Sequence, residues 1–383
     1  MVIVSIYGFA IIGIISIIFM LYDIFPRLIR HVERKETGNF KDEKEWYTAT
    51  KARQKKWLKK LPIVKIKDQT RLVLLDKLLG QHSNNTIQSW QYGALLKSED
   101  VTLDKKNKFY NIELKKWKVK PENVDFGFLG YEILDKYKDK NSLYSSMVEL
   151  KNSILSNVNE EGVLLYRKNV SNIAFVDTIG LAVPFLFKFS FIYGDDESYD
   201  IAKKNIEFYY KYSKKDYTNL PSHAIDLKSK CQLGSIGWGR GVGWFLLGLI
   251  DSYEYVLNSD DKKEMQKIIL EYASVLKNYF ENNSYLCSQL LFESHYDSSI
   301  NAIVGYFYAK LFIFTDNQEY FNLSKKCLDI IMKNTRKNGK IDYSQGDTKG
   351  IGMYSQCYDI MPFTQGIAVR AYEILYGGHL GSE

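Results

Sequence analysis

Apolar residues recur at helical spacing over most of the chain beyond residue 69. An apolar residue every three to four positions predicts amphipathic helices rather than strands. The breaks between these segments are rich in Gly, Asn and Asp, which end helices and form turns. We predict an all-α protein with about eleven helices, over Leu72–Leu79, Trp90–Leu96, Phe126–Tyr137, Leu143–Val158, Val176–Tyr193, Tyr199–Tyr212, Trp244–Leu257, Lys263–Phe280, Ser299–Phe314, Tyr320–Asn334 and Phe363–Tyr376.

Long and short gaps alternate between these segments, as in a series of helical hairpins. A hairpin of two amphipathic helices cannot bury its apolar face alone, so the hairpins must either stack as a solenoid or close on themselves. Closing about a dozen helices gives a double ring, an α/α barrel, whose mouth is formed by the loops at one end. We expect residues 69–383 to form this single domain.

The N-terminal segment Val2–Tyr22 carries no charged residue and is rich in Ile. About 20 apolar residues span a bilayer as a helix. A signal peptide is the alternative, but it has a basic start, a shorter apolar core and small residues at its cleavage site. No Lys or Arg precedes this run, and residues 22–26 do not fit a cleavage site. We therefore expect residues 1–26 to form an uncleaved transmembrane anchor.

The charges beside the anchor predict its orientation. Arg27, Arg30, Arg34 and Lys35 follow the apolar segment, whereas only the N-terminal amine precedes it. Basic residues stay on the cytoplasmic side of a membrane, so the main body is expected in the cytoplasm. Residues 27–68 are dense in Lys and Glu and are expected to form a juxtamembrane basic linker or helix.

Composition adds constraints on partners. The 29 Tyr, 21 Phe and 6 Trp suit a protein that contacts carbohydrate, although aromatic residues also fill cores. The net charge of +7 is spread along the chain, and no nucleic-acid-binding motif is present. The cysteines are far apart, without CxxC spacing, and predict neither a zinc site nor a disulfide framework. We expect no metal, no cofactor and no nucleic-acid partner.

Two aspartates stand at the start of predicted helices. Asp177 heads an otherwise apolar run that extends to Leu186, and Asp125 precedes Phe126. An aspartate in this position commonly caps the helix. It can also be a carboxylic acid held in an apolar pocket to move a proton, and two neighbouring carboxyl groups keep one of them protonated. The sequence pattern leaves both interpretations open.

The segment Trp238–Trp244 is the most informative cluster at the helix ends. Its three glycines let the backbone approach a ligand closely. Its tryptophans can stack on sugar faces, and Arg240 can bind a carboxylate. The alternative is a glycine-rich helix start with buried tryptophans. Other clusters at helix ends contain His223, and Trp90 with Tyr92.

Together these segments resemble the unsaturated glucuronyl and rhamnogalacturonyl hydrolases, glycoside hydrolase families 88 and 105. Residues 124–128 are similar to the HDxGF segment of the glucuronyl group, and residues 175–186 to the rhamnogalacturonyl segment WVDxLYMAxPFL. Residues 238–244 are similar to WxRGxGW, and residues 297–302 to the glucuronyl DSSAxA. The resemblance extends from about residue 69 to residue 375 and implies a six-hairpin (α/α)6 barrel.

The resemblance implies that Asp177 is the general acid and base and that Asp125 is its partner carboxylate. The residues that would line the sugar site or lie at its edge are His223, Trp238, Arg240, Trp244, Trp90 and Tyr92. In the family reaction the acid protonates the C4–C5 double bond of a 4,5-unsaturated uronic acid, and water adds at C5. The resulting hemiketal opens and releases the aglycone. No metal is needed, and Arg240 would bind the uronate carboxylate.

The chain departs from the family patterns around the site. The differing residues are Tyr166-Arg167 in place of a histidine, Val124 for the His of HDxGF, Phe175 for the Trp of WVD, and Gly180-Leu181 for the Tyr-Met of LYM. These positions would contact the sugar or its aglycone. Two alternatives therefore stand beside the uronyl hydrolase: a hydrolase of the same fold for another sugar in surface-polysaccharide metabolism, and a non-catalytic, membrane-anchored glycan-binding barrel.

Overall fold

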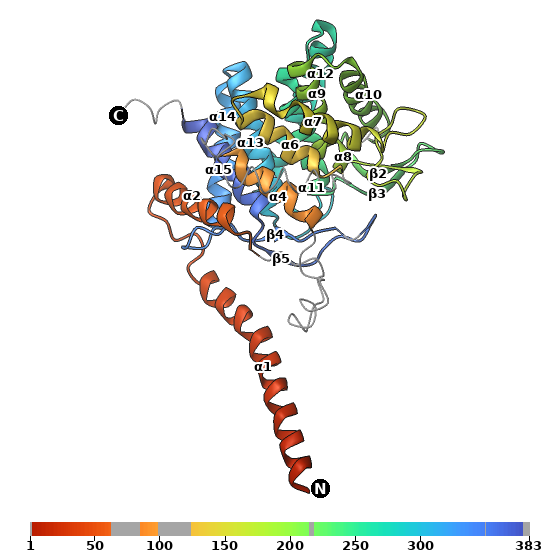
Figure 1. Ribbon diagram of the computed structural model, residues 1–383. Coiled ribbons are helices and arrows are strands. Elements are labelled where there is room, and N and C mark those ends of the chain that lie inside the picture. Colours follow the sequence, from red (N-terminus) through yellow and green to blue (C-terminus); the bar gives the residue numbers. More distant parts are fainter. Residues whose placement is uncertain (1, 63–84, 99–123, 214–217, 349, 378–383) are drawn as a thin grey trace.

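The computed structural model describes residues 2–62, 85–98, 124–213, 218–348 and 350–377. Over these ranges the chain is mostly helical, as predicted, and a long N-terminal helix projects from the main body (Figure 1). The elements are α1 (Val2–Arg34), α2 (Glu43–Lys59), α4 (Asn85–Lys97), α6 (Phe126–Lys136), α7 (Lys140–Leu155), β1 (Ile173–Phe175), α8 (Asp177–Leu181), α9 (Val183–Tyr193), α10 (Asp196–Ser213), β2 (Ser222–Asp226), β3 (Gln232–Ile236), α11 (Gly239–Ser252), η1 (Tyr253–Tyr255), α12 (Ser259–Asn282), α13 (Ser298–Thr315), α14 (Gln318–Lys333), β4 (Ser344–Gln345), β5 (Tyr358–Asp359) and α15 (Pro362–Tyr376).

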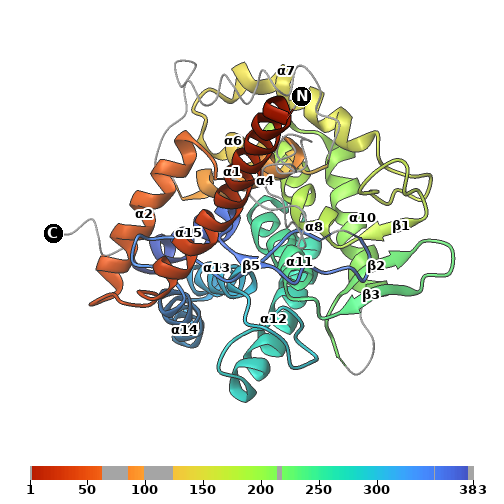
Figure 2. The same ribbon diagram turned by 90° about the horizontal axis from the view of Figure 1, so that it is seen from below.

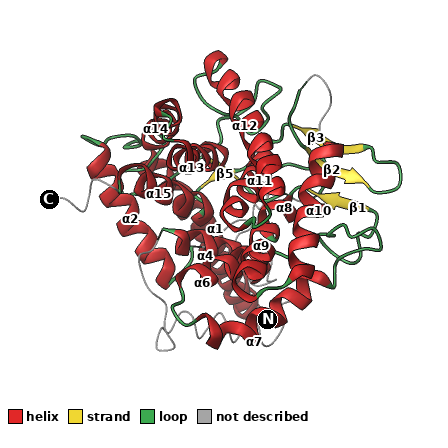
Figure 3. Cartoon of the chain, turned by 90° about the horizontal axis from the view of Figure 1, so that it is seen from above, coloured by secondary structure: helices red, strands yellow, loops and turns green. Residues whose placement is uncertain are grey.

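Six of the described helices pack in a closed inner ring. In this ring α4 packs on α6, α6 on α9, α9 on α11, α11 on α13, α13 on α15, and α15 again on α4. The helices α2, α7, α10, α12 and α14 lie outside, and each contacts one or two helices of the inner ring (Figure 3). The described helices thus form a double ring rather than an open solenoid.

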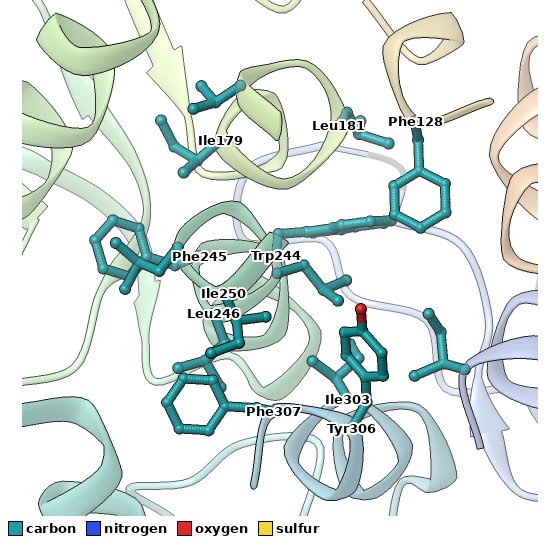
Figure 4. Packing of buried hydrophobic residues seen from close by; sticks show 14 of the residues in the cluster. Phe128, Ile179, Leu181, Trp244, Phe245, Leu246, Ile250, Ile303, Tyr306 and Phe307 are labelled. Atoms are coloured by element: carbon teal, nitrogen blue, oxygen red, sulfur yellow. The ribbon is translucent and has the colours of Figure 1, made fainter. Parts of the chain in front are cut away.

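The inner helices bury residues on most of their sides because they are covered both from the centre of the ring and from the outer helices. Every residue of α11 is buried, whereas α14 buries only one face. In the centre, Trp244 of α11 faces Phe128 of α6, with residues of α8 and α13 on either side (Figure 4). This packing fixes the helix ends that carry the polar residues described below.

The helix predicted over Val176–Tyr193 is in fact two helices. α8 ends at Leu181 and α9 begins at Val183, because Pro184 has no N–H group to continue the helical hydrogen bonds. Gly180 lets α8 lie close to α11: a Cβ at this position would come within 2.6 Å of the backbone oxygen of Trp244. The short helix α8 is therefore held tightly against the inner ring.

Two small antiparallel sheets were not predicted from the sequence. β2 pairs with both β1 and β3, and β4 pairs with β5. These strands have two to five residues, too few for an alternating pattern to be detected. β1 leads directly into Asp177, β2 carries His223, and β4 precedes the loop that lines the pocket.

The N-terminal helix α1 is continuous to Arg34 and extends beyond the predicted end of the anchor at residue 26. Large apolar side chains along it are exposed from Tyr7 to Val32. The stretch Tyr7–Arg34 contains a segment with a mean hydropathy of 2.3. By its length and composition, this helix could cross a membrane or act as a signal sequence.

The predicted linker region contains a helix that belongs to the barrel. α2 packs on α15 and α4 and buries Trp46 and Trp57. The expected helix over Leu72–Leu79 and the expected domain start at residue 69 lie outside the described residues.

Candidate active site

The N-terminal ends of α6, α8 and α11 and the loop after β4 enclose a pocket. Its lining residues are Trp90, Asp125, Tyr166, Asp177, Leu181, Trp238, Arg240, Trp244, Asp347 and Thr348. The cavity between them is about 30 Å³, which is room for about two water molecules. Figure 2 shows α8, α11 and β5 next to one another on the side of the barrel from which α1 projects. The pocket contains all the predicted site residues except His223 and Tyr92.

Asp177 is the first residue of α8, and Val176 takes the cap position, so the helix-capping interpretation of Asp177 is wrong. The carboxyl side chain is 18 % exposed. Its Oδ2 atom is buried and has no hydrogen-bond partner among the described residues. Burial raises the pKa of Asp177 to about 7, with Asp347 and Asp125 adding to the shift and Arg240 opposing it. A carboxyl group with this pKa can both donate and accept a proton near neutral pH.

His223 lies beside Asp177 because β2 pairs with β1: the Val176 N–H donates to the His223 carbonyl over 3.0 Å. The Nε2 atom is 3.7 Å from Asp177 Oδ2, too far for a hydrogen bond. The Tyr354 hydroxyl accepts from the Ser235 N–H and lies 3.1 Å from Nδ1. We therefore assign the Tyr354 hydroxyl as the donor to Nδ1, which accepts this hydrogen bond. The imidazole proton is then on Nε2, facing Asp177.

The imidazole of His223 is neutral near pH 7. Burial lowers its pKa to about 4, and the positive charge of Arg240 adds to this shift. His223 lies behind the pocket wall and is packed against the Trp238 ring, with 4.5 Å between ring centroids.

Asp125 occupies the N-cap position of α6, as the capping interpretation predicted, but its side chain makes no capping hydrogen bond. The carboxylate accepts from the Tyr166 hydroxyl over 2.9 Å and is ion-paired with Arg167. Burial raises the pKa of Asp125, while Arg167 and Tyr166 oppose the shift. Two residues that depart from the family patterns, Tyr166 and Arg167, thus hold this aspartate.

The tryptophans in the pocket wall come from α4 and from the segment Trp238–Trp244 at the start of α11. Trp90 of α4 meets Trp244 of α11 edge to face, with ring centroids 5.7 Å apart. Trp238 is 1 % exposed and donates its indole N–H to Gln345 Oε1 over 2.9 Å. Tyr92 packs against the core outside the set of lining residues.

Arg240 is only 2 % exposed, and its guanidinium is bound by the protein's own backbone. Nη1 donates to the Gln345 carbonyl over 2.6 Å, and Nη2 to the Gly346 carbonyl over 2.7 Å. Nη2 also lies 3.4 Å from Thr348 Oγ1. Arg240 therefore presents its charge to the pocket while both Nη atoms are engaged by the loop after β4.

Sequence reasoning missed Asp347 and Thr348, which complete the pocket. Burial raises the pKa of Asp347, and Arg240 opposes the shift. A weak signal was present in the sequence, because Gly346-Asp347-Thr348 is a polar, turn-forming cluster, although the next helix begins only at Pro362. No described group of three or more His, Cys, Asp and Glu residues could hold a metal ion.

The solved structures give the fold. A possible member of glycoside hydrolase family 105 from Klebsiella pneumoniae is similar with a TM-score of 0.69 and 15% sequence identity, covering 88% of this chain and 95% of that one. An unsaturated glucuronyl hydrolase from Bacillus sp. GL1 has a TM-score of 0.63 and 14% identity, covering 88% of this chain and 96% of that one. At such identities the likeness concerns the fold, that of the (α/α)6-barrel hydrolases.

The family follows from the sequence profile. No curated protein matches the chain. The model of Glycosyl Hydrolase Family 88 matches residues 94–372, which is more than half of the chain. As its motifs led us to expect, the chain belongs to glycosyl hydrolase family 88 and is a glycoside hydrolase.

Proposed function

We propose that this hydrolase releases a 4,5-unsaturated uronic acid from an oligosaccharide by hydrating its C4–C5 double bond. The observation that carries the proposal is the Asp177 carboxyl, which has a raised pKa and lines a pocket walled by tryptophans. Its Oδ2 atom, on the His223 side, has no hydrogen-bond partner among the described residues. An ordinary glycosidic displacement uses a carboxyl pair in which one member is a nucleophile or activates water. Here Asp125 is engaged by Arg167 and Tyr166, and the positive charge of Arg240 opposes the raised pKa of Asp347. We therefore assign the proton transfers to Asp177.

In the proposed reaction Asp177 begins in its acid form. It donates its proton to C4 of the double bond, and the positive charge that develops at C5 is shared with the ring oxygen. The carboxylate then takes a proton from a water molecule as the water oxygen bonds to C5, which restores the acid. The hemiketal formed at C5 opens by breaking the bond between C5 and the ring oxygen, which gives a ketone at C5 and a hemiacetal at C1. Collapse of this hemiacetal to an aldehyde releases the aglycone from C1 as an alcohol. One water molecule is consumed, and Asp177 ends as it began.

The other residues have supporting roles in this proposal. Neutral His223 directs its Nε2 proton toward Asp177 from the side opposite the pocket. Asp125 is ion-paired with Arg167 and adds to the raised pKa of Asp177. Arg240 would favour an anionic sugar by its charge rather than by bidentate hydrogen bonds, because both Nη atoms already donate to carbonyl groups.

We expect α1 to anchor the enzyme in a membrane with the barrel on the cytoplasmic side. Its exposed apolar surface supports insertion, and the basic residues at its C-terminal end support this orientation. The division into an anchor, a juxtamembrane segment whose helix α2 packs on the barrel, and the barrel domain is part of the same proposal.

The test is a panel of unsaturated disaccharides produced by polysaccharide lyases, incubated with the full-length protein in detergent. Loss of the conjugated-alkene absorbance on any member would support the proposal. A folded protein that leaves the whole panel unchanged would overturn it.

A hydrolase for another sugar is favoured by one observation. The pocket holds Asp125, Asp177 and Asp347, and the side chains leave room only for water. The arginines near them, Arg240 and Arg167, are already bound by protein groups. Such a site would suit a neutral or amino sugar that displaces part of its wall. A second panel of saturated neutral and amino-sugar glycosides, assayed by aglycone release, decides between the two substrates.

A further inference from the structure

The C-terminal end of α1 is bound to β5 and to Asp342, two residues before β4. Arg34 donates to both carboxylate oxygens of Asp342, over 2.8 and 2.9 Å, and to the Tyr358 carbonyl over 2.8 Å. Arg30, one turn earlier, pairs with Asp359 over 2.5 Å. We call residues 342–348 and 350–359 the strap. The same turn of α1 therefore holds both ends of the strap.

The charges at this joint are largely removed from water. The side chain of Asp342 is fully buried, and that of Arg336 is 3 % exposed. Arg336 bridges Asp342, Asp359 and Glu33 of α1 over 2.6, 2.8 and 2.6 Å. Removing one partner from such a buried network leaves an uncompensated charge, which costs far more than losing an exposed pair. The joint is therefore a specific contact rather than a chance encounter of surface charges.

The strap begins with a strained residue that this joint holds in place. Tyr343 has a φ of +60°, in the left-handed region that side chains other than glycine rarely adopt. Its N–H donates to Asp342 Oδ1 over 2.7 Å, and the Arg34 guanidinium lies 4.5 Å from its ring centroid. A strained conformation persists only where its surroundings enforce it. Arg34 helps to hold this conformation because it binds the Asp342 carboxylate and lies over the Tyr343 ring.

From this turn the strap runs directly into the pocket. Gln345 accepts the indole N–H of Trp238, and the carbonyls of Gln345 and Gly346 bind Arg240. The next residues, Asp347 and Thr348, line the pocket. On the return, Tyr354 binds His223. Within five residues of Tyr343, the strap thus contacts Trp238 and Arg240 and contributes Asp347 and Thr348 to the pocket.

We propose that Arg34, supported by Arg30, is a positioning residue of the active site. It acts through the strap, so that α1 helps to position the active-site residues in addition to its proposed role as an anchor. The catalytic consequence rests on the proposed function, whereas the mechanical coupling between α1 and the strap does not. Loss of Arg34 loosens the strap and lets Arg240, Asp347 and Thr348 depart from their positions around Asp177.

The test compares Arg34→Met with the wild type, both as full-length chains in the same detergent. Hydrogen exchange followed by mass spectrometry reports on peptides covering 342–348 and 350–359. We expect these amides to exchange about tenfold faster or more in the variant, because local opening becomes easier. On any substrate that the wild type hydrolyses, kcat/KM should fall about tenfold or more, since small misplacements in a site are costly.

The matched control is Lys151→Met. Lys151 is also partly buried and pairs with Asp195 and Glu197, but it joins α7 to the start of α10 instead of holding the strap. The substitution Lys151→Met should lower the unfolding temperature without changing hydrogen exchange in the strap. Unchanged strap exchange in Arg34→Met, or an equal increase in Lys151→Met, would overturn the coupling. Faster strap exchange with an unaltered kcat/KM would overturn the positioning role. Faster strap exchange in Arg34→Met, together with a wild type that hydrolyses no unsaturated disaccharide, would support the coupling and count against the proposed function.

Discussion

At the residue scale, the pocket contains three aspartates whose surroundings separate their roles. Asp125 is ion-paired with Arg167 and accepts from Tyr166. Asp177 lies close to neutral His223 and has one oxygen without a partner among the described residues. Asp347 faces Arg240 from the strap side. The least compensated of these carboxyl groups is the one best suited to carry a proton.

The raised pKa of Asp177 predicts a pH-dependent gain in stability for Asp177→Asn. The pKa is about 7 in the folded chain and about 3.9 in an unfolded one. The folded state thus holds this proton more tightly, and the stability that it contributes is lost as pH rises from about 4 through about 7. Asn stays neutral throughout. We expect the free energy of unfolding of the variant, relative to that of the wild type, to be higher at pH 8 than at pH 5 by on the order of 1–4 kcal/mol, measured by urea unfolding.

The control for this gain is Asp226→Asn. Hydrogen bonds from Ser229 lower the pKa of Asp226, so its substitution should bring no such gain at high pH. An Asp177→Asn variant whose stability relative to the wild type is the same at pH 5 and pH 8 would show that the carboxyl has an ordinary pKa.

At the scale of elements, the pocket depends on short segments that lie between the regular helices. α8 has five residues and is positioned by β1 before it, by α11 beside it and by the break at Pro184 after it. Because α8 is short, it has little helical stability of its own and relies on these contacts. The orientation of Asp177 is therefore sensitive to the distance between α8 and α11.

Gly180→Ala tests this dependence. An added Cβ would lie 2.6 Å from both Cε3 and the backbone oxygen of Trp244, so α8 must move away from α11. Overpacking of this kind costs about 1–3 kcal/mol. We expect a lower unfolding temperature and, on a substrate of the wild type, a lower kcat.

Gly305→Ala is the control, because its Cβ would meet the Cβ atom of Cys327 at a longer distance of 3.0 Å. If Gly180→Ala has full activity and no larger stability loss than Gly305→Ala, the close packing of α8 on α11 is not needed to position Asp177.

The sequence could predict the helices and most of the pocket, but not the strap. Long apolar repeats predict helices such as α12 and α13 because burial at regular spacing stabilises them locally. The strands β4 and β5 have two residues each, and their partners, Arg34 and Arg240, lie more than 100 residues away in the chain. Contacts of that kind leave no periodic signal. The split at Pro184, in contrast, could have been predicted from the missing N–H group.

At the scale of the whole molecule, a buried cluster of charges ties together four helices of the inner ring. Lys97 of α4 donates to Glu132 of α6 over 2.6 Å and to Asp251 of α11 over 2.8 Å. Tyr306 of α13 donates to the other oxygen of Asp251 over 2.5 Å. These side chains are almost completely buried, so each depends on the others to remain compensated.

Lys97→Met should therefore destabilise the barrel by about 3–5 kcal/mol, because it leaves two buried carboxylates without their cation. The measurement is the free energy of unfolding in urea. Lys263→Met provides the comparison, since Lys263 and its partner Asp260 are 77% and 84% exposed and such pairs contribute little. Equal effects of the two substitutions would mean that the central cluster does not hold the ring together.

The proposed orientation in the membrane can be tested with a native cysteine. Cys231 is exposed on the barrel. If the barrel is cytoplasmic, a membrane-impermeant maleimide should label it only after the cells are permeabilised, and Cys231→Ser should lose that label. Labelling of Cys231 in intact cells would place the barrel outside.

The most direct test of the account follows two quantities at once for the full-length wild type and Asp177→Asn: loss of the alkene absorbance and release of the aglycone. Hydration predicts that the wild type loses one double bond for each aglycone released. The Asn variant should remain folded but be slower by about a thousandfold or more, in keeping with the upper range of general acid–base effects. Aglycone release with the absorbance retained, or near-normal turnover by Asp177→Asn, would contradict the mechanism.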